Sequence, residues 1–467
     1  MTGLEPLYTA AEMRAAEERY PGHPESMSEL MERAGRAVAR IALEDFEGAR
    51  SYTVVCGRGN NGGDGRVAAE ALREAGCDVR VVEAEPDAEP EELGAPDVLI
   101  DAVFGTGFSG EPRPAAARLL DQMNELGVPI LAVDIPSGVD ASTGEVLGEA
   151  VRAHLTVTFH EDKVGLHVAP GSHHAGYVEV AEIGLEPAET EHARVTSQVL
   201  ERVPQRGPDD NKYTAGHVLV VGGSPGLTGA ASLTALAALR ADAGYVTVAA
   251  PRSTLVVFEV RLLEAVKRGL PEDAEGRLDE RAFTAIEELA AKASAVALGP
   301  GLGRSTGTKA LIRRLLATLA LPVVVDADAL WELEPGDWPG PRVLTPHAGE
   351  LGRLLGKESS WVDAHRLAAA RLAVERFGCV VVLKGPGTLV AAPAQGTLVC
   401  PGIAALATAG TGDVLTGIIG SFLAKGMEPR LAAAAAVTAQ AAAAVEAGRR
   451  AGLVASDLVE ALPSVFP

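Results

Sequence analysis

The sequence has few cysteines, few aromatic residues and no uninterrupted long hydrophobic run, and each shortage excludes a class of protein. Its four cysteines, Cys56, Cys77, Cys379 and Cys400, show no C-x-x-C spacing, so we expect reduced packing thiols in a cytoplasmic protein rather than disulfides. The longest apolar tract, residues 431–445, is rich in alanine and interrupted by Thr and Gln. Alanine is too weakly hydrophobic for a membrane span, so the tract predicts a buried helix.

Basic residues are scarce relative to acidic ones. The chain has 41 Lys and Arg against 63 Asp and Glu, a formal net charge of −22. Because nucleic acids and anionic membranes attract proteins with excess Lys and Arg, we expect neither as a partner. A small anionic ligand stays compatible, since backbone N–H groups can hold an anion inside an acidic protein. The first twenty residues contain acids and no apolar core, so we expect no signal peptide there. Thr9 and Glu12 instead predict the capping box of a helix.

The chain is long enough for two domains, since 467 residues exceed what one ordinary core covers. Strands and helices alternate in both halves, which predicts two α/β domains whose parallel sheets are covered on both faces. A polar, proline-containing stretch at 185–212 separates the halves. We place the domains at 1–190 and 191–467.

The first candidate site is CGRGNNGGDG (56–65), at a predicted strand-to-helix turn. Its G-x-G-x-x-G pattern, with Glu83 about 20 residues further on, is typical of a nicotinamide dehydrogenase. The side chains of Asn60, Asn61 and Asp64 argue against that interpretation, because a pyrophosphate needs bare backbone there. Amides and a carboxylate suit hydroxyl, amide or hard-cation contacts, and ordinary Asx turns are the structural alternative.

Two more polar loops, 101–110 and 134–138, each begin with an Asp directly after an apolar run. The carboxyl ends of parallel strands meet at one edge of a sheet, where α/β proteins bind ligands. Each Asp alone could cap a turn. Three such loops in one domain favour a shared binding site.

These loops carry a family resemblance. NNGGDG, DAVFGTGFSGEPR, VDIPSGVDASTGEV and TFHEDKVGLHVAPG resemble, in this order, the N-terminal half of the bifunctional NAD(P)H-hydrate repair enzymes. That half epimerises hydrated NADH or NADPH, NAD(P)HX, at C6. The resemblance implies a Rossmann-like three-layer fold that binds the damaged dinucleotide without hydride transfer.

The resemblance also implies site residues. The implied substrate contacts are Asn60, Asn61, Gly62, Gly63, Asp64, Gly105, Thr106, Gly107, Phe108, Ser109, Gly110, Glu111 and Asp134. The implied potassium ligands are Asn61, Asp101 and Ser137, whose oxygens suit a hard cation. Asp134 and Lys163 are our candidates for proton transfer, chosen by polarity and position.

The second half carries six polar or glycine-rich motifs, most of them at predicted strand ends. Taken singly, each has a bland explanation. Glycine turns occur wherever short loops reverse the chain, and His347 alone would favour a helix cap or a satisfied core group. Asp413 alone could complement a helix dipole, worth at most ~1 kcal/mol. The motifs are GGSPGLTGAA (222–231), GPGLG (299–303), DADAL (326–330), LTPHAGE (344–350), VVLKG (381–385) and ATAGTGDVLTG (407–417).

KYTAGHVLVVGGS (212–224) and, after it, GPGLG, DADAL, LTPHAGE, VVLKG and ATAGTGDVLTG resemble, in this order, the NAD(P)H-hydrate dehydratase domain. That domain has a ribokinase-like α/β fold and in bacteria uses ADP. The resemblance implies phosphorylation of the C6 hydroxyl of the hydrate, then loss of phosphate. Asp413 would be the general base for that hydroxyl, and the helix start around it would stabilise the phosphoryl group. The implied substrate contacts are Ala230, Gly303, His347 and Asp413, and the implied nucleotide contacts are Lys384, Gly385, Pro386, Gly387, Thr388 and Gly412.

The sequence departs from the family at Ala348, where we expect proline, and at 401–410, which lacks the expected Asn and Met. Neither change removes a reactive group. We therefore predict a cytoplasmic homo-oligomeric enzyme that epimerises R and S NAD(P)HX. It would dehydrate the S form with ADP and Mg²⁺, giving NAD(P)H, AMP and phosphate. The alternative is a ribokinase-like small-molecule kinase with a fused, non-catalytic dinucleotide-binding domain.

Overall fold

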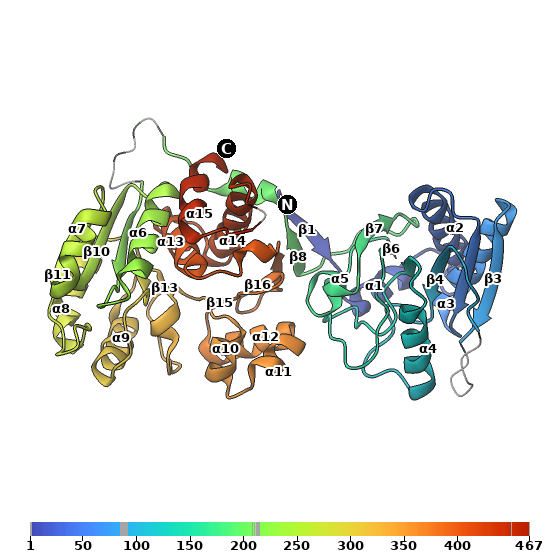
Figure 1. Cartoon of the computed structure of the whole chain (residues 1–467), viewed down its shortest axis with the longest axis horizontal. Helices are drawn as coiled ribbons and strands as arrows, with labels where there is room; N and C mark the ends of the chain where they lie inside the picture. Colours follow the sequence, from blue (N-terminus) through green and yellow to red (C-terminus); the bar gives the residue numbers. More distant parts are fainter. Residues whose placement is uncertain are drawn as a thin grey trace. The chain divides into compact units, whose positions relative to one another are not determined.

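The computed structural model describes residues 2–84, 92–207, 209, 211, 215–449 and 451–466 (Figure 1). The chain forms two compact units. One spans Pro6–Ala193, and the other contains Arg194 onward together with the residues up to Glu5. The division falls inside the polar stretch 185–212. No sequence signal indicated that the first residues belong to the second unit.

The first unit is built on a six-stranded sheet in which every pair of neighbours is parallel. This confirms the predicted parallel α/β architecture. The chain starts in the middle of the sheet and turns outward in both directions, so β2 and β4 part at the point where the strand order reverses. The order is β3 (Asp78–Glu83), β2 (Ser51–Cys56), β4 (Val98–Ala102), β5 (Ile130–Val133), β6 (Leu155–Phe159) and β7 (Tyr177–Ala181).

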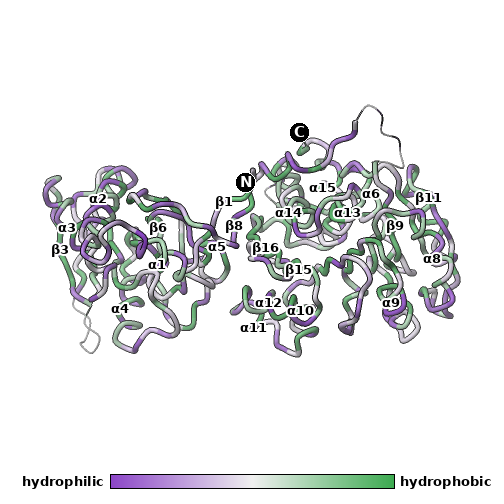
Figure 2. The backbone as a smooth tube through the Cα atoms, turned by 180° about the vertical axis from the view of Figure 1, so that it is seen from behind, coloured by the Kyte–Doolittle hydropathy of each residue, from purple (hydrophilic) through white to green (hydrophobic). Residues whose placement is uncertain are grey.

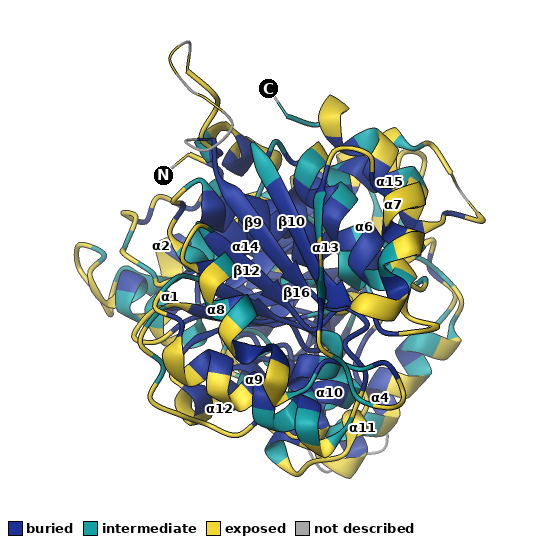
Figure 3. Ribbon diagram, turned by 90° about the vertical axis from the view of Figure 1, so that its left-hand side faces the viewer, coloured by how far each residue is buried: buried dark blue, intermediate teal, exposed yellow. Residues whose placement is uncertain are grey.

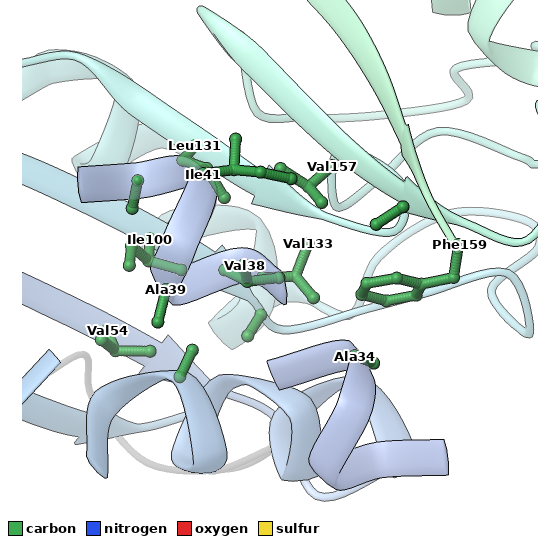
Figure 4. Packing of buried hydrophobic residues seen from close by; sticks show 14 of the residues in the cluster. Ala34, Val38, Ala39, Ile41, Val54, Ile100, Leu131, Val133, Val157 and Phe159 are labelled. Carbon is green, nitrogen blue, oxygen red and sulfur yellow. The ribbon is translucent and has the colours of Figure 1, made fainter. Parts of the chain in front are cut away.

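Helices cover both faces of this sheet, which gives three layers. On one face, Val38 and Ile41 of α2 (Met27–Asp45) pack with Val133 and Leu131 of β5 (Figure 4). On the other face, the cluster that contains α4 (Pro114–Glu125) takes the alternate strand residues, such as Val55 and Leu99, as the period of two in a strand requires. The remaining helices are α1 (Ala10–Glu18), α3 (Asn60–Glu74) and α5 (Val164–His167). Thr9 and Glu12 form the predicted capping box of α1.

The second unit contains an eleven-stranded sheet. Neighbours from β11 through β15 are parallel, and β16 and β17 join antiparallel. The strand order reverses between β9 and β12. The order is β11 (Val266–Leu270), β10 (Tyr245–Pro251), β9 (His217–Val221), β12 (Ala295–Leu298), β13 (Val323–Val325), β14 (Arg342–Leu344), β15 (Val380–Leu383), β16 (Thr388–Ala391), β17 (Leu398–Cys400), β8 (His192–Val195) and β1 (Leu4–Leu7).

This sheet is also covered on both faces, and Figure 3 shows its strands buried behind helices with exposed outer faces. Gly420 of α13 lies against Val218 and Ala297 on one face, while the alternate residues Leu219 and Val296 face the cluster of α8 and α9. The helices are α6 (Thr228–Arg240), α7 (Leu255–Arg261), α8 (Phe283–Ala290), α9 (Thr306–Thr318), α10 (Ala348–Leu355), α11 (Ser359–Ala364), α12 (Arg366–Phe377), α13 (Thr411–Ala424), α14 (Pro429–Glu446) and α15 (Ala455–Ala461).

Two composition-based predictions are confirmed. The alanine-rich tract lies in α14, where most residues are buried, and no helix among the described residues is long and apolar enough to cross a membrane. Hydrophilic and hydrophobic segments are interspersed along the described backbone of both units in Figure 2. All four cysteines are free thiols, and Cys56, Cys379 and Cys400 are buried.

Candidate active sites

The first unit has a pocket of about 690 Å³ at the carboxyl ends of its strands. Its wall comes from the turn after β2, the loop after β4, the end of β5 and the facing helices α1 and α2. The polar loops predicted to converge therefore do converge. The predicted residues that line the pocket are Asn60, Asn61, Asp64, Gly105, Thr106, Gly107, Phe108, Ser109, Glu111 and Asp134. Gly62, Gly63, Gly110, Asp101, Ser137 and Lys163 lie outside that lining set.

The glycines of the G-x-G-x-x-G pattern serve close packing of the turn. A Cβ on Gly62 would lie 1.8 Å from the Gly57 carbonyl oxygen, and one on Gly57 would lie 2.0 Å from the Val103 oxygen. Glu83, which a dinucleotide dehydrogenase would direct to a ribose, instead accepts hydrogen bonds from Arg66 at the surface. The turn is thus built differently from a dehydrogenase fingerprint.

The Asp134 side chain lies in the pocket wall and is held by several contacts. Its backbone lies in the left-handed region at φ 67°. Its Oδ2 accepts a hydrogen bond from the Thr106 N–H at 2.9 Å, and its Oδ1 accepts one from the Thr158 hydroxyl at 3.4 Å. The Lys163 ammonium lies 3.7 Å from Oδ1. This arrangement fixes the direction of the carboxylate.

Lys163 is fully buried behind Asp134. Its ammonium donates to the Thr158 hydroxyl at 2.9 Å and to the carbonyls of Phe159 at 2.9 Å and Glu161 at 2.7 Å. Burial lowers the pKa of Lys163, and the charge of Asp134 opposes that shift. The Lys163 ammonium donates to groups inside the protein and does not line the pocket. It can affect a bound ligand only through its contact with Asp134.

Two further carboxyl groups, Asp64 and Glu17, line the same pocket. Burial raises the pKa of Asp64 well above its usual range, and the nearby charges of Asp134 and Glu17 raise it further. Burial, followed by Asp134, also raises the pKa of Glu17. The pocket therefore places two carboxyl groups with raised pKa values in the same wall as Asp134, which lies 3.7 Å from the Lys163 ammonium. Sequence reasoning missed Glu17, because α1 contributes it with no motif around it.

The three candidate potassium ligands, Asn61, Asp101 and Ser137, differ in how their polar atoms are hydrogen-bonded. Both side-chain polar atoms of Asn61 are buried without a hydrogen-bond partner. Asp101 is fully buried and accepts hydrogen bonds from the Ser137 hydroxyl at 2.6 Å and the Ser137 N–H at 2.8 Å. Burial raises the pKa of Asp101 to about 6 against those hydrogen bonds. An orphaned amide oxygen, a hydroxyl and a buried carboxylate fit a hard monovalent cation.

The second unit holds a different constellation at the start of α13. Gly410 lies in the left-handed region at φ 88° and precedes the first turn, so Asp413 falls within that turn. A Cβ on Gly412 would lie 3.3 Å from the Lys384 Nζ atom. The N–H groups of a helix start, bare glycine backbone and an ammonium group are together suited to an anion.

Asp326 holds the ammonium group in place. Its Oδ1 accepts hydrogen bonds from Lys384 Nζ at 2.9 Å and from the Thr345 hydroxyl at 2.7 Å, and its Oδ2 accepts one from the Thr416 hydroxyl at 2.7 Å. Burial opposes ionisation, yet Lys384 and the two hydroxyls keep the pKa of Asp326 below its usual value. Sequence reasoning gave Asp326 no role, although it follows a buried strand as Asp101 and Asp134 do.

The pKa of Asp413 is shifted upward, opposite to that of Asp326. Burial raises its pKa to about 7, with a further contribution from the negative charge of Asp326, while Lys384 opposes the shift. The backbone carbonyl of Asp413 accepts a hydrogen bond from the Thr234 hydroxyl of α6 at 3.0 Å. A carboxylate that gains and loses its proton near neutral pH suits general-base chemistry.

His347 caps a helix, as its residue type alone favoured. Its Nδ1 accepts hydrogen bonds from the N–H groups of Gly349 at 3.0 Å and Glu350 at 3.4 Å. The Glu350 carboxylate in turn accepts from the His347 N–H at 2.9 Å. Ala348 is the first residue of α10, so the helix forms without proline there. Lys384 N–H donates to the Pro346 carbonyl at 2.9 Å, which brings His347 beside Lys384.

The two remaining glycine-rich loops meet where the strand order reverses. Gly223 N–H donates to the carbonyls of Pro300 at 3.1 Å and Gly301 at 3.0 Å. Gly303 lies in the left-handed region at φ 79° and donates its N–H to Asp328 Oδ2 at 2.9 Å. Ala230 lies in the first turn of α6 next to these loops. The structure thus brings the predicted residues to one edge of the sheet.

Family comparisons divide the chain as the structure does. Residues 218–464 match the NAD(P)H-hydrate dehydratase family, and residues 27–94 and 82–165 match the family described as YjeF-related protein N-terminus.

A full-length relative covers nearly the whole chain. The bifunctional NAD(P)H-hydrate repair enzyme of Moorella thermoacetica is 37% identical over 94% of this chain and 92% of its own length.

Two solved structures match the second unit. An ADP/ATP-dependent NAD(P)H-hydrate dehydratase from Bacillus subtilis, co-crystallised with ATP and Mg²⁺, is 30% identical with a TM-score of 0.51, covering 58% of this chain and 96% of that chain. A ribokinase-like superfamily protein from Enterococcus faecalis has a TM-score of 0.52 at 23% identity over 60% of this chain and 97% of that chain. The latter likeness concerns the fold, which is ribokinase-like in the second unit as predicted.

Proposed function

The chain belongs to the family of bifunctional NAD(P)H-hydrate repair enzymes, and we propose how its two units divide that work. The unit around 1–190 epimerises NAD(P)HX, and the unit around 191–467 dehydrates the S form with ADP. The observation that carries the dehydratase assignment is the juxtaposition of Asp413, Gly412 and Lys384 at the start of α13.

In the dehydratase site, Asp413 accepts the proton of the C6 hydroxyl as that oxygen attacks the terminal phosphoryl group of ADP. The N–H groups of the first turn of α13 and the Lys384 ammonium stabilise the charge on the transferring oxygens. AMP leaves. The C6–O bond of the phosphorylated hydrate then breaks, a proton leaves C5, and the C5–C6 double bond of the dihydronicotinamide forms with release of phosphate.

The nucleotide lies on the 384–388 turn and at Gly412, and the hydrate contacts Ala230, Gly303, His347 and Asp413. We propose that Mg²⁺ enters with the phosphates of ADP, in line with the ATP and Mg²⁺ of the Bacillus subtilis relative. The protein itself supplies further positive charge at the phosphates, from the Lys384 ammonium and from the N–H groups at the start of α13. The His347 side chain is more than half exposed, and its Nε2 atom lies 3.5 Å from the Glu350 carboxylate, so the hydrate would meet the imidazole together with that carboxylate.

In the epimerase site, the pocket of the first unit receives the hydrated ring. We propose that Asp134 takes the proton of the C6 hydroxyl while the C6–N1 bond breaks, N1 gains a proton and C6 becomes an aldehyde carbon. Closure of the ring on the other face of that carbon re-forms the C6–N1 bond and returns both protons, which gives the other epimer. Lys163, 3.7 Å from Asp134, orients that side chain. Asn60 to Asp64 and the Gly105–Glu111 loop contact the dinucleotide. Asn61, Asp101 and Ser137 would hold K⁺, whose positive charge would satisfy the orphaned amide oxygen and the buried carboxylate.

A phosphate balance separates this proposal from a small-molecule kinase of the same fold. The protein is incubated with the S hydrate and ADP, and AMP, inorganic phosphate and NAD(P)H are quantified together. The dehydratase forms the three products in equal amounts. A stable phosphorylated hydrate with no NAD(P)H would identify a kinase and refute the proposal.

We further propose a cytoplasmic homo-oligomer. The four free thiols support a reducing compartment. Assembly is supported by α7, which is apolar on both sides: Phe258 is buried, whereas Val256, Val260 and nearby Leu263 are each at least two-thirds exposed. Sedimentation of the full chain at several concentrations tests the assembly, and a monomer throughout would contradict it.

A further inference from the structure

Arg366 is a buried cation that the proposed mechanism leaves unused. It is the first residue of α12, and only 2% of its surface is exposed. Its Nη2 donates to the backbone carbonyls of Leu383 at 3.2 Å, Lys384 at 3.5 Å and Gly387 at 3.3 Å. These carbonyls belong to the end of β15 and the turn assigned above to the nucleotide. The guanidinium therefore grips that turn from the protein interior.

The glycines of the turn are required by this grip. Gly385 has φ 144° and Gly387 has φ 61°, both in the region that favours glycine. A Cβ on Gly385 would lie only 2.8 Å from Arg366 Nη1. The backbone can wrap the guanidinium closely because it carries no side chain there.

The grip also sets where the N–H groups point. In a trans peptide the N–H points opposite to the carbonyl. The Leu383 carbonyl faces Arg366, and the N–H of the same peptide, on Lys384, donates outward to Pro346. By the same geometry, the N–H of Gly385 faces away from Arg366, because the Lys384 carbonyl faces toward it. Arg366 thus orients the backbone donors of the turn as well as its shape.

Packing alone does not account for this residue. Arg366 Nε and Nη1 are buried without a hydrogen-bond acceptor, and the carboxylate that pairs with it, Asp363, is 3.7 Å from Nη1 and largely exposed. A buried guanidinium with unused donors costs free energy that an apolar side chain of similar volume avoids. A turn with two glycines at positive φ has many accessible conformations. Holding it in one shape for the nucleotide would offset the cost of burying Arg366.

We propose that Arg366 is a positioning residue of the dehydratase: by holding the Lys384–Thr388 turn in its nucleotide-receiving shape, it sets the affinity for ADP. The inference rests on the assignment of that turn to the nucleotide. Arg366 does not touch the reacting atoms, so its effect falls on nucleotide binding rather than on the chemical step.

The chain supplies a matched control in Arg342. This side chain is equally buried, and its guanidinium donates to the carbonyls of Leu316, Leu319, Leu321 and Pro341. Arg342 begins β14, whereas the nucleotide turn follows the carboxyl end of β15. The two arginines therefore make the same kind of contact at opposite ends of the strands.

The test compares Arg366→Lys with Arg342→Lys in the full-length protein. Lysine keeps the charge but lacks the planar fork of donors. Arg366→Lys is expected to raise KM for ADP about tenfold with kcat at saturating ADP changed by no more than about twofold, since hydrogen bonds to a charged donor are among the stronger ones. Arg342→Lys is expected to lower Tm and leave KM for ADP unchanged. An unchanged KM in Arg366→Lys, or an equal rise in both variants, would overturn the inference.

Should Arg366→Lys not fold, Arg366→Gln retains amide donors and takes its place. Hydrogen exchange in the wild type provides a test without substitution. ADP is expected to slow amide exchange both at Gly385, Gly387 and Thr388 and at the start of α12. Protection of the turn alone would contradict the coupling. Failure of the proposed function looks different: the wild-type protein would then show neither an ADP-dependent rise in Tm nor AMP formation.

Discussion

The two sites of this chain use similar elements for different tasks. Each lies at the carboxyl edge of a parallel sheet, near the start of a helix that follows a glycine-rich turn, and each contains an Asp in that turn or helix. At α3, the positions around the helix start carry Asn60, Asn61 and Asp64. At α13, the first two helical residues are Thr411 and Gly412, where α3 has Asn60 and Asn61, and the Lys384 ammonium lies beside Gly412.

The difference lies in what fills the space at the helix start. Amide and carboxyl side chains leave the first pocket suited to a neutral ring, hydroxyls and a hard cation. Bare backbone and a lysine leave the second suited to a phosphoryl group. The two lysines also differ in position. The Lys163 ammonium is buried and donates to the Glu161 carbonyl, whereas the Lys384 ammonium donates to Asp326 and lies beside Gly412 at the start of α13. The glycine pattern alone therefore does not identify a phosphate site.

The largest expected effect comes from a substitution that changes one side-chain atom group in the dehydratase site and should leave the epimerase site unaffected. Asp413→Asn removes the general base while keeping the size of the side chain, so dehydration of the S hydrate should fall by about two orders of magnitude or more. Nucleotide binding and epimerisation should stay close to wild type. The measurement is steady-state NAD(P)H formation, with the ADP-dependent rise in Tm as the binding control. Near-wild-type turnover would remove Asp413 from the role of base.

The converse substitution tests the first pocket. Asp134→Asn should slow epimerisation of the R hydrate by about a hundredfold, because the amide cannot accept the proton. Dehydration of supplied S hydrate should be unaffected, since the other unit performs it. The rate is measured as loss of the R epimer without ADP. Glu83→Gln is the control, because Glu83 lies outside the pocket and should leave the rate unchanged. A wild-type rate in Asp134→Asn would exclude the assigned role.

The raised pKa of Asp413 predicts the pH dependence of dehydration. Its carboxyl has a pKa of about 7, and only the ionised form accepts a proton. Dehydration at limiting hydrate should therefore fall about tenfold for each pH unit below that value. Asp413→Asn, which lacks the titrating carboxyl group, is measured in the same buffers as the reference. A flat dehydratase profile between pH 5 and 7 would contradict the tuning.

The smallest expected effect concerns the cation. K⁺ should raise the Tm of the epimerase unit by a few degrees, roughly the effect of 1 kcal/mol in a domain of this size. Li⁺ at equal ionic strength is the salt control. Asn61→Ala should abolish the K⁺-specific part, because it removes a candidate ligand oxygen that has no hydrogen-bond partner among the described residues. A K⁺ effect that persists in Asn61→Ala would exclude Asn61 as a ligand.

The sequence predicted the elements whose signals are local. Apolar strands followed by Asp or glycine located the loops of both sites, and the order of the motifs identified the family. Asp326, Glu17 and Arg366 were missed because their roles depend on partners distant in the chain. Asp326 acts through Lys384 and Thr416, for example, and no spacing rule reports such a contact. For His347 the sequence left a helix cap and a satisfied core group open, and the structure shows the cap.

The division of labour between the sites is tested most directly by near-ultraviolet absorbance of the dihydronicotinamide. The protein is mixed with an equal mixture of R and S NADHX, ADP, Mg²⁺ and K⁺. If both units are active, the absorbance returns in full, because the first unit converts R to S and the second drains S. Recovery of only half would contradict the epimerase assignment, and no recovery would contradict the dehydratase assignment on which the account depends.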